Sequence, residues 1–91
     1  MFIADLIVTK EGPAVAFEGD DDPCAAAWNA EDGVLSLCLR RTGRVERRTI
    51  APELAPSLTA AESLKIIRVG RSGPDAYWEL PVRPGGFQDP G

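Results

Sequence analysis

Two short segments carry most of the charge-based chemistry in this sequence. Half of the basic residues fall within nine positions, at Arg40, Arg41, Arg44, Arg47 and Arg48. The other segment is acidic and contains Glu18, Asp20, Asp21 and Asp22. Arginine forks bind carboxylates and phosphates, whereas clustered carboxylates bind cations or arginines. Both segments therefore point to recognition of a charged partner.

The sequence contains few of the residue types that enzymes commonly use for catalysis. The chain contains no histidine, and its only cysteines are Cys24 and Cys38. The commonest general base and the commonest metal ligand are therefore absent, and no Ser-His, Cys-His or His-metal site can be built from this chain alone. The cysteines lack CxxC spacing, and no second ligand pair exists for zinc. We interpret them as small buried apolar residues and expect no enzymatic activity, no cofactor and no bound metal.

The acidic segment supports three interpretations. Its carboxylates offer the oxygen ligands that Mg²⁺ and Ca²⁺ prefer, but they lack the alternating spacing and the distal glutamate of an EF-hand loop. A solvated acidic loop is the simplest alternative, because adjacent carboxylates repel one another unless they are solvated or paired. The third interpretation, which we favour over a metal site, is contact with arginines of a partner protein.

The arginine segment also has competing interpretations. Its side chains suit phosphate contacts, with nearby aromatic rings stacking on bases. The net charge of −4 and the pI of 4.7 argue against a nucleic-acid-binding domain, which is usually basic. An edge strand kept soluble by its charge is the structural alternative. Tryptophans usually fill a small core, but one exposed beside arginines would be an interface hot spot, and we assign that part to Trp78.

Length and composition are those of one globular domain. The chain has 91 residues, of which 44% are apolar and 26% charged, and this composition is too apolar for intrinsic disorder. We expect residues 1–82 to form the compact domain and residues 83–91 to form a flexible tail. No segment approaches the ~20 apolar residues of a membrane helix, and the start lacks the basic region of a signal peptide. These features predict a cytoplasmic protein with no membrane association.

Alternating apolar residues and turn signals predict short strands over most of the chain. In the clearest strand, residues 34–40, Leu35, Leu37 and Leu39 share one face. The other expected strands are residues 2–9, 14–18, 44–50, 65–71 and 76–82. A capping box over Thr59-Ala60-Ala61-Glu62 predicts the start of one short helix.

Residues 24–32 fit two structures. A helix would have Asp22 as its N-cap, Pro23 at its first position and Gly33 after its end. A strand would instead form a hairpin with residues 34–40, since Asp-Gly before an alternating strand is a common turn signal. We favour the hairpin.

The loop length of this hairpin decides how the two cysteines are placed. A three-residue loop, Ala30-Glu31-Asp32, puts Cys24 opposite Cys38, where mild oxidation would join them. A loop one residue longer puts Cys24 opposite Leu39. We favour the three-residue loop.

The expected fold is a β-dominated α+β domain, a small antiparallel meander of about six or seven strands with one or two short helical segments. The expected function is non-catalytic protein–protein binding by a small acidic inhibitor or adaptor, through the acidic loop or the arginine-rich edge. By analogy of class alone, a phage anti-defence protein such as an anti-CRISPR, or a toxin-neutralising protein, has this character. A second copy of the chain is another expected partner. The alternative function is a nucleic-acid-binding accessory protein that uses the basic edge at residues 40–48.

Overall fold

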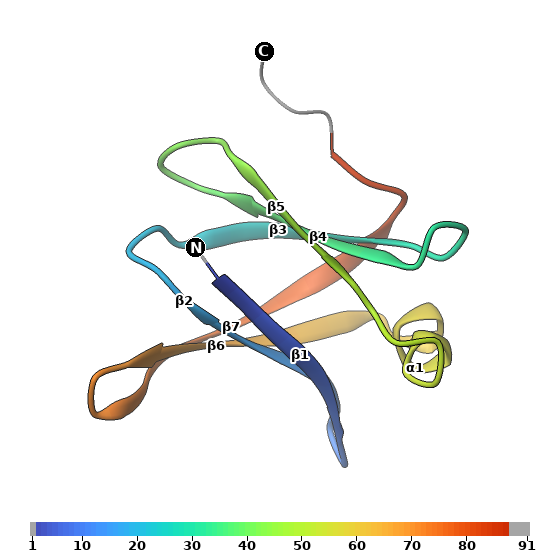
Figure 1. Ribbon diagram of the computed structural model, residues 1–91, viewed down its shortest axis with the longest axis horizontal. Helices are drawn as coiled ribbons and strands as arrows, with labels where there is room; N and C mark the ends of the chain where they lie inside the picture. The colour runs from blue at the N-terminus through green and yellow to red at the C-terminus, as the bar shows by residue number, and fades with distance from the viewer. Residues whose placement is uncertain (1, 88–91) are drawn as a thin grey trace.

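Residues 2–87, which the computed structural model describes with side chains from Thr9 onward, form seven strands and one short helix (Figure 1). In chain order these are β1 (Phe2–Thr9), β2 (Gly12–Glu18), β3 (Pro23–Asn29), β4 (Val34–Leu39), β5 (Val45–Thr49), α1 (Ala55–Ala60), β6 (Ser63–Gly70) and β7 (Gly73–Pro84). The predicted β-dominated fold class is confirmed.

The strands form one sheet in the order β1-β2-β6-β7-β3-β4-β5. Strands that follow one another within β1–β2, β3–β4–β5 and β6–β7 pair antiparallel, as expected. The pairs β2–β6 and β3–β7 are parallel, so the expectation of a purely antiparallel meander is wrong in this respect. Both parallel pairs join strands that are distant along the chain, and long connections are what parallel pairing requires.

The longest strand, β7, connects the two halves of the sheet. Residues Gly73 to Pro81 pair with β6, whereas Val82, Arg83 and Pro84 pair with β3. The sheet curls so that β1 approaches β5, and β3, β4 and β5 lie across from β1, β2 and β6 (Figure 1). The space between the two halves holds the core.

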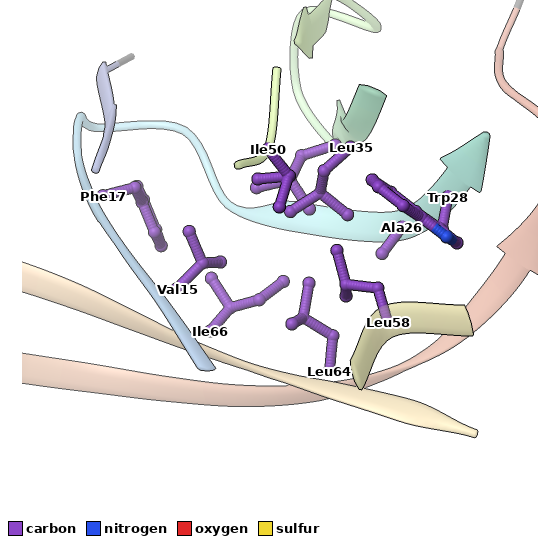
Figure 2. Packing of buried hydrophobic residues seen from close by; sticks show 10 residues of the cluster. Val15, Phe17, Ala26, Trp28, Leu35, Ile50, Leu58, Leu64 and Ile66 are labelled. Carbon is purple, nitrogen blue, oxygen red and sulfur yellow. The ribbon is translucent and has the colours of Figure 1, made fainter. Parts of the chain in front are cut away.

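Side chains from both halves and from α1 fill this space (Figure 2). Leu35 and Leu37 are 0% exposed and Leu39 is 4% exposed, which confirms the predicted inner face of β4. The buried cluster consists of Val15, Phe17, Ala26, Trp28, Leu35, Leu37, Ile50, Leu58, Leu64 and Ile66.

The favoured hairpin is confirmed, since β3 pairs antiparallel with β4. Its register differs from the prediction by one residue, because Trp28 lies opposite Leu35 and Asn29 lies opposite Val34. The loop therefore has four residues, not three. The helix alternative for this segment is excluded.

Asn29 explains the longer loop. Its side-chain Oδ1 accepts hydrogen bonds from the backbone N–H groups of Glu31 at 3.0 Å and Asp32 at 3.1 Å. Its carbonyl accepts the N–H of Gly33 at 2.8 Å, and Gly33 has a φ of +70°, which favours glycine. Asparagine commonly anchors turns in this way.

A shift of register near the start of β3 changes the predicted cysteine pairing. Pro23 lies opposite Leu39, and the next pair is Ala25 with Cys38, so Cys24 is an extra residue in a β-bulge. Direct backbone pairing of Cys24 with Cys38 is therefore wrong. The interpretation of both cysteines as buried is also wrong, because Cys24 is exposed and Cys38 is half-buried.

Helix α1 begins before the predicted capping box. Pro56 lies in its first turn, where a missing N–H breaks no helical hydrogen bond, and Leu58 packs into the core. Thr59 lies near the end of the helix and does not cap its start. Its Oγ1 donates to the Ala55 carbonyl at 3.1 Å and accepts from Trp28 Nε1 at 3.0 Å.

The last strand extends beyond the predicted domain boundary, since β7 includes Arg83 and Pro84. Residues 88–91 lie outside the described residues, and the flexibility of the tail stays a prediction. Among the residues that the structure describes, no helix has the length and apolar character needed to cross a membrane.

Candidate partner-binding site

Three connections lie at the same end of the sheet, on the left in Figure 1. They are the acidic loop (residues 18–22) between β2 and β3, the arginine loop (residues 40–44) between β4 and β5, and the turn at residues 70–73 between β6 and β7. We term this region the loop end. It contains most of the site residues predicted from the sequence.

Asp21 joins the acidic loop to the arginine loop. Its carboxylate accepts the backbone N–H groups of Arg41 at 2.9 Å and Thr42 at 3.0 Å, and the Thr42 hydroxyl at 2.8 Å. It also accepts the N–H of Asp22 at 2.9 Å. Because Asp21 is only 8% exposed, this predicted contact residue supports the loops from within.

These contacts keep Asp21 ionised over a wide pH range. Burial disfavours the charged carboxylate and raises its pKa, but the hydrogen bonds from Arg41, Thr42 and Asp22 stabilise the charge. Together they lower the pKa of Asp21 from 3.8 to about 2. The arginine loop therefore rests on a carboxylate that stays charged well below neutral pH.

The backbone of the arginine loop forms a tight turn. The N–H of Gly43 donates to the Leu39 carbonyl at 3.0 Å, and the N–H of Leu39 donates to the Arg44 carbonyl at 2.9 Å. Gly43 has a φ of +72°, a conformation in which other residues are strained. The chain therefore reverses direction at Thr42 and Gly43, between β4 and β5.

Arg68 on β6 connects the acidic loop to the beginning of β7, next to the turn at residues 70–73. Its Nη1 lies 3.3 Å from Asp22 Oδ1, and its Nε donates to Asp75 Oδ1 at 2.9 Å. Its guanidinium lies 5.6 Å from the centroid of the Trp78 ring. Asp22 therefore has a partner within the fold. Sequence reasoning missed Arg68 and Asp75 because both lie far along the chain from the two charged segments.

The remaining charges at the loop end form a mixed surface. Arg40, Arg41 and Arg44 are exposed, and within the described part of the chain their side chains make no ion pair. Asp20 is exposed beside Arg41 and Arg44, and Glu18 is exposed at the end of β2. The two predicted segments are thus brought together, with arginines as the larger exposed group.

Two predicted arginines lie outside this loop. Arg47 on β5 donates from Nη2 to the Phe87 carbonyl at 3.1 Å. Arg48 is half-buried on the same strand, opposite Leu35. The side chain of Arg47 therefore holds the segment after β7 against the sheet.

Trp78 is not the exposed aromatic that the sequence analysis expected. It is half-buried, packs against the core, and its ring centroid lies 5.5 Å from that of Phe17. Its neighbour Tyr77 points to the opposite face and is 66% exposed. The alternation of apolar residues along β7 contained this signal. Trp78, Leu80 and Val82 occupy every second position, so they lie on the same face of the strand.

The arginine loop and the acidic loop border a shallow hollow of about 200 Å³. It is lined by Asp20, Asp21, Leu39, Arg41, Thr42, Arg44 and Glu46. The lining offers charges of both signs but no thiol or imidazole to act as a nucleophile or base. Residues 9–87 contain no cluster of three or more carboxylate or thiol groups arranged to hold a metal ion. A hollow with this lining can accept a charged side chain.

Comparison with known proteins adds no relative to this description. No family model matches the chain, and no significant match is found among curated proteins or among solved structures.

Proposed function

We propose that this protein is a non-catalytic protein-binding domain, an inhibitor or adaptor, whose arginine loop contacts carboxylates on its partner. The observation that carries the proposal is the Asp21 carboxylate bonded to the backbone of Arg41 and Thr42. A loop fixed before binding loses less conformational entropy on association. Arginine side chains on such a loop favour bidentate pairing with carboxylates.

The mixture of charges supports a protein partner over a uniform polyanion. Asp20 lines the same hollow as the exposed Arg41 and Arg44, so a matching surface needs a basic group beside its acidic ones. Complementary patterns of this kind give specificity and fast association. Tyr77 adds an exposed aromatic of the type found at interface hot spots. A cytoplasmic location belongs to the same proposal.

Affinity capture from a lysate of the native host, with identification by mass spectrometry, tests the proposal. The variant Arg41→Glu/Arg44→Glu is compared with Lys10→Glu/Arg83→Glu, which changes the net charge equally at two exposed residues outside the arginine loop. We expect the loop variant to lose the partner and the matched variant to retain it. With the purified pair, added salt should slow association more than it speeds dissociation. Equal capture by both variants would contradict the proposal.

The nucleic-acid alternative makes a different prediction. Reversal of Asp20 to Lys removes an anion beside the arginines without touching the Asp21 contacts. It should weaken binding to a protein partner that pairs with Asp20, but it should strengthen binding to DNA or RNA, whose phosphates it would attract. Capture that disappears after nuclease treatment would favour the alternative.

A further inference from the structure

The two cysteines meet on the outer face of β3 and β4. Cys24 is the extra residue of the bulge, between the Pro23–Leu39 and Ala25–Cys38 pairs. A bulge sets two residues opposite one, so Cys24 and Ala25 both lie beside Cys38. The Cys24 Sγ donates to the Cys38 carbonyl at 3.3 Å. The bulge thus brings together two thiols that the regular register of the hairpin would separate.

The two thiols differ in accessibility. Cys24 is exposed and Cys38 is half-buried, and both are free. Burial raises the pKa of the Cys38 thiol, the neighbouring Cys24 raises it further, and Arg83 opposes this shift. An external reagent therefore meets Cys24 first, with Cys38 next to the sulfur that has reacted.

We propose that Cys24 and Cys38 form a thiol–disulfide exchange site, which takes up low-molecular-weight disulfides and closes as an intramolecular Cys24–Cys38 disulfide. The Cys24 thiolate attacks one sulfur of the small disulfide, whose S–S bond breaks, and one small thiol leaves. The Cys38 thiolate then attacks Cys24 Sγ in the mixed disulfide, and the second small thiol leaves. Two electrons pass from the protein to the small disulfide, and the two cysteine protons end on the released thiols.

Incubation of the full chain with oxidised glutathione tests this site, with intact mass and non-reduced peptide mapping as readouts. We expect the wild-type monomer to lose the mass of two hydrogen atoms and to yield a Cys24–Cys38 linked peptide. In Cys38→Ser the resolving thiol is missing, so a glutathione adduct should accumulate on Cys24. In Cys24→Ser the internal bridge should be absent.

A control variant keeps two thiols on the same face of the hairpin and moves the second to position 36, where Ser36 is 3% exposed. In Ser36→Cys/Cys38→Ser the second thiol lies opposite Ala27, three positions from Cys24, beyond the about 7 Å between Cα atoms that a disulfide spans. This variant should stop at the mixed disulfide, and amide spectra of each variant establish that it is folded. An internal bridge in the control, a wild-type adduct that does not resolve, or an unreacted wild-type chain would overturn the proposal.

Discussion

The turns at the two ends of β4 share a backbone shape but have different anchors. In the first, the N–H of Gly33 donates to the Asn29 carbonyl, and in the second the N–H of Gly43 donates to the Leu39 carbonyl. Both glycines have a positive φ, +70° and +72°. The difference lies in which side chain satisfies the N–H groups at the tip.

The first turn is anchored within itself, whereas the second is anchored from another loop. Asn29 Oδ1 accepts the N–H groups two and three positions ahead of it. At the equivalent position of the second turn stands Leu39, which is 4% exposed and belongs to the core. Its place as acceptor is taken by Asp21, twenty positions away from Arg41. Because Leu39 is needed in the core, the N–H groups of the arginine loop bond to Asp21 of the acidic loop, and this links the two loops.

Truncation of Leu37 to Ala should have the largest effect and should weaken both turns together. Leu37 is 0% exposed in the strand between them, and removal of buried methyl groups costs about 2–5 kcal/mol of unfolding free energy. Denaturant titration measures this loss. The exposed Arg40→Ala serves as control and should stay within about 0.5 kcal/mol of the wild type. If Leu37→Ala cost no more unfolding free energy than Arg40→Ala, the placement of Leu37 in the core would be contradicted.

Replacement of Asn29 by Ala should separate the two turns. It removes the acceptor of two backbone hydrogen bonds and should cost about 1 kcal/mol. Amide hydrogen exchange should accelerate at Glu31 and Asp32, while Arg41 and Thr42 keep their protection because Asp21 anchors them. Equal acceleration in both turns would show that they are not independent.

The inner faces of the strands could be predicted because alternation is a local property. Leu35, Leu37 and Leu39 identify their face without knowledge of the partner strands. The same argument would have assigned Trp78 to the core and Tyr77 to the surface. Loop length was harder, because it depends on whether Asn29 turns its side chain back to the backbone.

The remaining features depend on contacts between distant residues. The parallel pair of Val15 with Ile66 joins segments that no sequence pattern links. Asp20, Asp21 and Asp22 are chemically identical in the sequence, and only the folded loops distinguish them. Asp21 is enclosed by the arginine loop, Asp22 pairs with Arg68, and Asp20 stays exposed. The distribution of charge along the sequence was therefore enough to locate the candidate site. The structural role of each aspartate could not be predicted from it.

Acid should act on the turns differently, because aspartate titrates and asparagine does not. The pKa of Asp21 is about 2 in the folded chain, below the ordinary value of 3.8 that applies to the unfolded chain. The ionised carboxylate therefore stabilises the folded state in full above about pH 4. As the pH falls toward 2, the carboxyl group takes up a proton and its hydrogen bonds to Arg41 and Thr42 weaken. We expect exchange protection at Gly43 to fall over this interval while Gly33 retains more of its protection.

Two variants assign this acid response to a single carboxyl group. Asp21→Asn removes the titrating group and should abolish the pH dependence of protection at Gly43. Asp20→Asn changes an exposed neighbour in the same hollow and should leave that dependence intact. The comparison uses single amides in place of global stability, so that effects of acid elsewhere in the chain are not attributed to Asp21. If protection at Gly33 and Gly43 fell in parallel in the wild type, acid would be unfolding the hairpin as a whole, and Asp21 would not be the specific anchor of the arginine loop.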